Sequence, residues 1–126
     1  MRDEKPRILV VDDESDTLLY LYDFLTSEGY FVEGSSNPAD ALEDIRRRAP
    51  AVVLADVRMR EMDGFELLRR IRAAFPKTRV LLMSAYADEG APAAAAAFGA
   101  EAFLSKPIRR EELLSVLERL TPEIAG

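Results

Sequence analysis

Five side chains that could bind phosphate or metal stand where short apolar runs of the sequence end. Asp12 and Asp13 follow ILVV, Asp56 follows VVLA, Ser84 closes RVLLMS and Lys106 follows AFLS. Adjacent carboxylates repel, and burying one is unfavourable unless a cation or hydrogen bonds compensate. If these ends meet, three carboxylates would need a divalent cation. Oxygen ligands without nitrogen or sulfur donors favour Mg²⁺ over zinc or copper.

The apolar runs alternate with helical patterns, and this alternation predicts how the five side chains are positioned. The first, third and fourth runs are uniformly apolar, which is typical of strands covered on both faces. Ser15 and Asn37 are predicted helix N-caps. The predicted strands are 7–11, 30–35, 51–55, 79–84 and 101–105, and the predicted helices are 15–28, 38–48, 64–74, 88–98 and 109–120.

Five strand–helix repeats predict an α/β fold with one doubly wound parallel sheet and helices on both faces. In such sheets, sites form outside the carboxyl ends of the strands. For any single acid, a helix cap or an ordinary loop position is an adequate alternative. The five positions taken together favour a site.

Composition narrows the class of protein. The chain has 126 residues, a length that predicts a single domain with a core of about residues 7–120 and a tail of residues 121–126. Its net charge of −6 argues against direct nucleic-acid binding. It contains no cysteine and no histidine, which excludes disulfides, thiolate metal sites and catalysis by imidazole. No apolar run reaches membrane-spanning length and no signal peptide is evident, so a cytoplasmic location is expected.

Four ordered blocks of the sequence carry a family resemblance: VVDDE, LADVRMREMDGFELLRRIR, LLMSAYAD and GAEAFLSKPI. Through them the chain resembles the CheY-like receiver domains of response regulators over about residues 7–120. The resemblance implies a flavodoxin-like fold with five helices around a parallel sheet in strand order 2-1-3-4-5. It also implies a cis peptide bond between Lys106 and Pro107.

The same resemblance implies a phosphorylation-activated signalling switch and not an enzyme. Asp56 would accept a phosphoryl group from a partner histidine kinase or histidine phosphotransfer protein. Asp13, Asp56 and the backbone carbonyl of Arg58 would hold Mg²⁺, and Asp12 would act partly through water. Because the chain has no histidine, the phosphohistidine donor must belong to another molecule.

Further residues have roles implied by the resemblance. Lys106 and Ser84 would bind phosphate oxygens, and the small side chain of Ala85 would let its N–H approach the phosphate. Phe103 would turn inward as Ser84 moves, and this pair would relay the phosphorylated state. A lone aromatic residue on a strand is also typical of plain core.

Three residues flank the predicted phosphorylation site. Arg58 lies two residues after Asp56, and Tyr86 lies two residues after Ser84. In receiver domains the side chains at these positions tune the lifetime of the acyl phosphate. Both could instead be ordinary residues at the edge of the sheet. Arg60 stands where many receivers have proline, which predicts a more mobile loop.

The first predicted helix is apolar nearly all round, so its periodicity does not orient it. By resemblance, the side carrying Tyr20 and Phe24 packs on the sheet. Leu18, Leu19 and Tyr22 would then form an outer patch that docks a partner's helices. Scattered exposed apolar residues can also occur without any function.

Two other functional classes remain open. An aspartyl-nucleophile phosphatase or phosphotransferase with Mg²⁺ usually has a second acid two residues after the nucleophile, where this chain has Arg58. A degenerate receiver that only binds proteins would not need the five site residues. We expect a monomer or a weak phosphorylation-dependent dimer, either stand-alone or part of a longer protein. The downstream effector is open.

Overall fold

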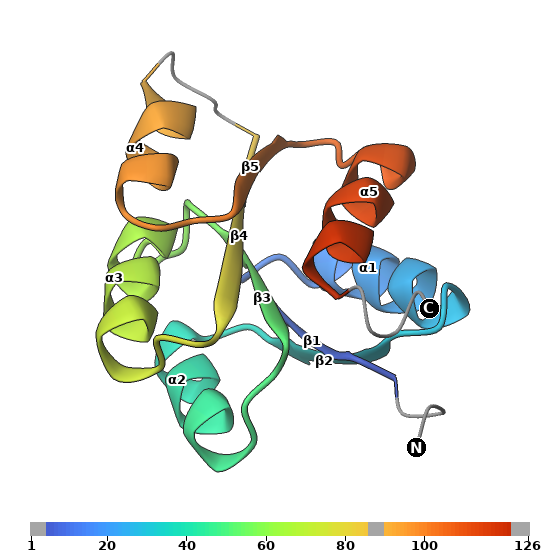
Figure 1. Cartoon of the computed structure of the whole chain (residues 1–126), viewed down its shortest axis with the longest axis horizontal. Helices are drawn as coiled ribbons and strands as arrows, with labels where there is room; N and C mark the ends of the chain where they lie inside the picture. Colours follow the sequence, from blue (N-terminus) through green and yellow to red (C-terminus); the bar gives the residue numbers. More distant parts are fainter. Residues whose placement is uncertain (1–4, 86–89, 122–126) are drawn as a thin grey trace.

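The computed structural model describes residues 5–85 and 90–121, which form five strands alternating with five helices (Figure 1). The elements are β1 (Arg7–Val11), α1 (Ser15–Ser27), β2 (Phe31–Ser35), α2 (Pro38–Arg47), β3 (Val52–Asp56), α3 (Gly64–Ala74), β4 (Arg79–Ser84), α4 (Ala91–Ala97), β5 (Ala102–Ser105) and α5 (Arg110–Leu120). Each predicted strand and helix is present, with ends within about two residues of the prediction where they can be compared. The predicted start of the fourth helix at residue 88 lies outside the described residues.

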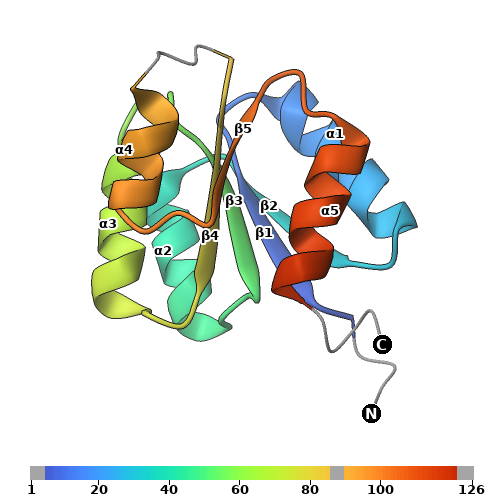
Figure 2. The same ribbon diagram turned by 45° about the horizontal axis from the view of Figure 1, so that its top comes forward.

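The strands form one parallel sheet in the order β2-β1-β3-β4-β5, as the sequence resemblance implied. Helices α1 and α5 cover one face, and α2, α3 and α4 cover the other (Figure 2). Because all five strands run the same way, their carboxyl ends lie at one edge of the sheet. The predicted site residues are therefore brought to that edge.

Two apolar cores lie on the two faces of the sheet. Side chains of alternate strand residues, such as Ile8 and Val10, pack with α1 and α5, whereas Leu9 and Val11 pack with α2, α3 and α4. All five residues of β3 are buried, which explains why its sequence shows no polar alternation. This central strand gives Asp56 a rigid support.

N-cap residues were predicted for both α1 and α2, and a side-chain capping interaction is present in α2. The Asn37 side chain accepts hydrogen bonds from the N–H groups of Ala39 and Asp40, so the predicted cap of α2 is confirmed. The predicted cap of α1 is wrong by one residue, because Glu14 is the N-cap and Ser15 is the first helical residue.

Gly64 lets α3 begin directly against the end of β3. A Cβ atom at this position would lie 2.5 Å from the backbone carbonyl oxygen of Asp56, far inside van der Waals contact. The N–H of Gly64 donates to the carbonyl of Val57. The loop between β3 and α3 is thereby closed tightly beside the phosphoacceptor candidate.

The orientation of α1 differs in part from the prediction. Leu21, Phe24 and Leu25 are buried, but Tyr20 is 41% exposed and stacks on Phe24 at the margin of the domain. Leu18 was expected on the outer face, yet it is partly buried and packs against the core. Leu18 lies three residues before Leu21, on the same face of the helix, and this places it toward the sheet.

The end of the site strand β5 has the expected backbone geometry. The peptide bond between Lys106 and Pro107 is cis, which confirms the prediction. None of the helices within residues 5–85 and 90–121 has the length and apolar character needed to span a bilayer.

Candidate functional site

The centre of the site is an ammonium group held between two buried carboxylates. Lys106 Nζ lies 2.7 Å from Asp12 Oδ2 and 2.9 Å from Asp56 Oδ1. Asp12 is fully buried, Asp56 is 5% exposed, and 14% of the Lys106 side chain is exposed. Three residues that the sequence placed at the ends of different strands therefore meet in one buried ionic cluster.

Backbone hydrogen bonds between neighbouring strands hold this cluster in position. The N–H of Asp12 donates to the carbonyl of Ser35, and the N–H of Lys106 donates to the carbonyl of Ser84. Asp12 Oδ1 accepts a 2.9 Å bond from the N–H of Glu14, and Asp56 Oδ2 accepts a 3.0 Å bond from the N–H of Arg58. Each carboxylate thus uses one oxygen to bind the backbone and the other to bind Lys106.

The electrostatics of the cluster reflect its burial. Burial raises the pKa of Asp56 above its ordinary value; the Lys106 ammonium opposes the rise and the charge of Asp12 adds to it. Burial alone would lower the pKa of Lys106, but its hydrogen bonds to Asp12 and Asp56 outweigh that effect and raise it. Lys106 is therefore protonated at neutral pH and supplies the positive charge of the site.

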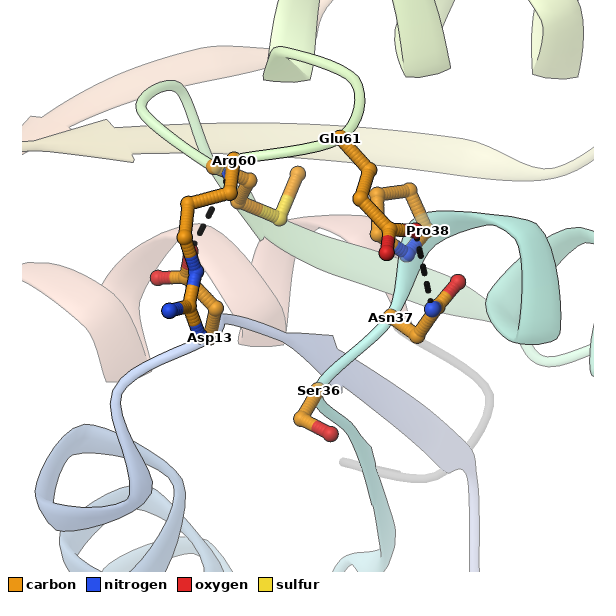
Figure 3. Close-up of a pocket in the computed structure, with 7 residues that line it drawn as sticks. Asp13, Ser36, Asn37, Pro38, Arg60 and Glu61 are labelled. Carbon is orange, nitrogen blue, oxygen red and sulfur yellow. Dashed lines mark hydrogen bonds and ion pairs between the residues drawn. The ribbon is translucent and has the colours of Figure 1, made fainter.

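Asp13 lies beside this cluster and has a different counter-ion. Its Oδ2 accepts a 3.1 Å hydrogen bond from the N–H of Arg60, and Arg60 Nε lies 3.5 Å from the same oxygen. Figure 3 shows the Arg60 side chain folded over Asp13. The loop between β3 and α3 is therefore joined to the end of β1.

A cavity of about 290 Å³ borders Asp13 and Arg60. On its other side, Asn37 Nδ2 donates a 3.0 Å hydrogen bond to Glu61 Oε1 (Figure 3). The lining residues are Asp13, Ser36, Asn37, Pro38, Met59, Arg60 and Glu61. The loop that follows the phosphoacceptor candidate is thus tied to two different strand ends across one polar cavity.

The remaining predicted residues that the structure describes lie at or near this edge of the sheet. Ser84 is 2% exposed at the end of β4, and Ala85, directly after it, is exposed. Phe103 is partly buried and packs with the core on the α2–α3–α4 face. The Arg58 side chain is exposed, whereas Tyr86 lies outside the described residues.

The donor atoms of the site suit a magnesium ion. Asp12, Asp13 and Asp56 offer only carboxylate oxygens, which match the preference of Mg²⁺. Within residues 5–85 and 90–121, no three acidic side chains are gathered into a ready-made metal cage. Their three negative charges are instead offset in part by the two positive charges of Lys106 and Arg60.

The sequence reasoning missed three contacts at the site. Glu14 Oε1 lies 3.6 Å from Lys106 Nζ, the Arg60 guanidinium pairs with Asp13, and Glu61 binds Asn37. The acidic run that contains Glu14 was a visible signal. No sequence pattern indicated the other two contacts, because they join separate loops.

Comparisons with known proteins agree on one family. The sequence model described as "Response regulator receiver domain" matches residues 8–118. The chain is 34% identical over 116 residues to the DNA-binding transcriptional regulator NtrC of Proteus hauseri, and 39% identical over 112 residues to the transcriptional regulatory protein ZraR of Escherichia coli O157:H7. These matches cover 92% and 89% of this chain but only 24% and 25% of those proteins.

Solved structures are similar over nearly the whole chain. A CheY-like receiver domain protein from Methanospirillum hungatei JF-1 matches with a TM-score of 0.87 and 28% identity, covering 95% of this chain and 97% of that one. CheY in the CheX-CheY-BeF3-Mg+2 complex from Borrelia burgdorferi matches with a TM-score of 0.85 and 26% identity, covering 90% of this chain and 87% of that one.

Proposed function

The chain belongs to the response regulator receiver domain family, and we propose that it is a phosphorylation-controlled switch whose phosphoacceptor is Asp56. Members of this family are regulatory domains of two-component signalling and not enzymes in the usual sense. The observation that supports Asp56 most strongly is the Lys106 ammonium, 2.9 Å from its carboxylate at the end of the buried strand β3.

The proposed reaction is the transfer of a phosphoryl group from a phosphohistidine of a partner kinase or phosphotransfer protein. A carboxylate oxygen of Asp56 forms a bond to phosphorus while the bond between phosphorus and the imidazole nitrogen breaks. The electron pair of that bond stays with the partner's imidazole. Since the chain contains no histidine, it cannot supply this donor itself.

The residues around Asp56 would stabilise the charge of the incoming group. Transfer of this kind depends on positioning and electrostatic stabilisation. Lys106, already at Asp56, would pair with one phosphate oxygen. The Ser84 hydroxyl and the N–H of Ala85 would donate to others, because Ser84 ends β4 and Ala85 follows it at the same edge of the sheet.

Magnesium would complete the site. When bound, Mg²⁺ neutralises the negative charge of the acidic side chains and the phosphoryl oxygens. Asp13, Asp56 and the backbone carbonyl of Arg58 would hold it, and Asp12 would act partly through water. The oxygen-only donor set supports this assignment, as does the similarity to CheY from the Borrelia burgdorferi complex, which contains Mg²⁺.

The phosphorylated state would be relayed by Ser84 and Phe103. Ser84 ends β4, and its paired strand β5 carries Phe103, which is partly buried against the α2–α3–α4 face. A shift of Ser84 toward the phosphate would change the space available to this ring. The exposed side chain of Arg58, and Tyr86, would tune how readily water reaches the acyl phosphate.

The exposed face of α1 would dock the phosphoryl donor. Leu19 is 66% exposed and Tyr22 is 48% exposed, so two of the three predicted docking residues are available to a partner. Leu18 contributes less, because it packs against the core. The helix begins three residues after Asp12 and so lies beside the phosphorylation site.

The setting of this switch is proposed from composition and resemblance. We expect a cytoplasmic protein without membrane or direct nucleic-acid contacts, active as a monomer or a weak phosphorylation-dependent dimer. Its receiver domain would extend over about residues 7–120. The downstream partner would recognise the surface that changes on phosphorylation.

Phosphorylation with a small acyl-phosphate donor and Mg²⁺ tests this function. Intact-mass spectrometry should show one added phosphoryl group on the wild type and none on Asp56→Asn. Asp40→Asn, which changes an exposed acid on α2, should be labelled like the wild type. Undiminished labelling of Asp56→Asn would refute the assignment.

A further inference from the structure

Arg60 and Asp13 form an ion pair whose two partners differ in exposure. Only 18% of the Asp13 side chain is exposed, whereas 86% of the Arg60 side chain is exposed. The carboxylate is therefore fixed within the fold, and the guanidinium reaches it from solvent. An exposed charged side chain of this kind can leave its partner with little loss of stability.

We propose that Arg60 is an internal counter-ion that competes with a divalent cation for Asp13 and thereby lowers the affinity of the site for Mg²⁺. This inference rests on the proposed function, in which Asp13 is a magnesium ligand. The same oxygen, Asp13 Oδ2, accepts from the backbone N–H of Arg60 and lies 3.5 Å from its Nε. Two cations close to one oxygen repel, so the guanidinium would move aside as the metal binds.

The surrounding contacts allow the side chain to leave without moving the loop. The hydrogen bond from the Arg60 backbone to Asp13 does not depend on the guanidinium. The neighbouring Glu61 is held separately by Asn37 across the cavity. The loop therefore keeps both attachments when the Arg60 side chain swings into solvent.

The cavity beside Asp13 also favours a hydrated cation. Its volume is about 290 Å³, and its lining includes polar groups of Ser36, Asn37 and Glu61. Mg²⁺ in proteins usually keeps several of its water molecules. A cavity of this size provides room for such water molecules on the Asp13 side of the site, where Arg60 is the cation that contacts the carboxylate.

Lys106 cannot have the same role. Its ammonium contacts two carboxylates, Asp12 and Asp56, and its side chain is 14% exposed. Removing it would unbalance the whole cluster. Arg60 contacts one carboxylate from the surface, so its side chain can be replaced with little effect on the fold.

Titration calorimetry with MgCl₂ and the unphosphorylated protein tests the proposal. Arg60→Gln should bind Mg²⁺ about twofold to fivefold more tightly than the wild type, the range expected for losing one exposed ion pair. Arg60→Lys keeps the charge and should stay within about twofold of the wild type. Arg47→Gln makes the same charge change on α2, where Arg47 pairs with Asp44, and should leave the affinity unchanged.

Each outcome of this titration has a distinct meaning. Equal dissociation constants for Arg60→Gln and the wild type would overturn the competition and leave the magnesium site intact. An equal gain in Arg47→Gln would also overturn it, because net charge would then be the cause. If neither the wild type nor Arg60→Gln took up Mg²⁺, the proposed metal site itself would be wrong. Binding by Arg60→Gln alone would support the proposal.

Discussion

Replacing Lys106 by methionine should destabilise the metal-free protein strongly, because it leaves two buried carboxylates facing each other. Lys106 Nζ lies within 3 Å of Asp12 Oδ2 and of Asp56 Oδ1. These two oxygens are therefore at most about 6 Å apart, and unit charges at that separation repel by about 3 kcal/mol at an effective dielectric constant of about 20. Methionine fills similar space without the charge.

The expected loss in the free energy of unfolding is about 3 kcal/mol, within the range of about 3–5 kcal/mol measured when one partner of a buried ion pair is removed. Urea unfolding followed by far-ultraviolet circular dichroism, without divalent cations, measures this loss. Lys77→Met is a matched control, because Lys77 is exposed and the substitution is the same. Its unfolding midpoint should remain that of the wild type.

A second substitution identifies the cause of the loss. In the Lys106→Met background, Asp56→Asn removes one of the two facing charges and should recover most of the lost stability. A Lys106→Met protein as stable as the wild type would show that the ion cluster contributes nothing. If Asp56→Asn gave no recovery, repulsion between the carboxylates would not be the reason for the loss.

Three further predictions concern other parts of the domain. In a urea titration, Gly64→Ala should lower the free energy of unfolding by about 1–3 kcal/mol, because the added Cβ would clash with the Asp56 carbonyl oxygen. Gly90→Ala is the control and should leave this free energy nearly unchanged, because Gly90 has open space around it. Burial raises the pKa of Tyr30 above 10.0, so the unfolded chain loses the phenolic proton at a lower pH than the folded protein does, and the free energy of unfolding should fall as pH rises from about 10 through the folded pKa. Tyr30→Phe should lessen this fall in urea titrations at alkaline pH. The same fall in Tyr30→Phe as in the wild type would contradict the prediction. Replacing Leu19 and Tyr22 with arginine should slow phosphotransfer from a kinase and spare labelling by a small acyl phosphate, whereas equal loss with both donors would mean that the substitutions damage the fold.

The positions of the site residues could be predicted because strand ends are visible in the sequence. Uniformly apolar runs mark buried parallel strands, and the first polar residue after each run marks the functional edge. Asp12, Asp56 and Lys106 were found in this way, and the structure brings them into direct contact. The ion pairs themselves were not predictable, because they depend on side-chain conformations across separate loops.

The predicted N-cap and the predicted buried face of α1 were partly wrong for local physical reasons. The side chain of Asp12 accepts a hydrogen bond from the N–H of Glu14, and Glu14 occupies the N-cap position, so the helix begins at Ser15. Leu18 follows the buried stripe, while Tyr20 lies at its margin, where its ring stacks on Phe24. A helix that is apolar nearly all round gives no strong periodic signal for choosing between these faces.

The hydrogen bond from Lys106 to Asp12 joins residues that are 94 positions apart in the chain. During synthesis, Asp12 and Asp56 therefore leave the ribosome well before the lysine that pairs with both of them. A growing chain at that stage carries both carboxylates without the ammonium group that lies between them in the folded domain. The buried ion cluster is consequently complete only once β5 has been made, so its contribution to stability is gained late in synthesis.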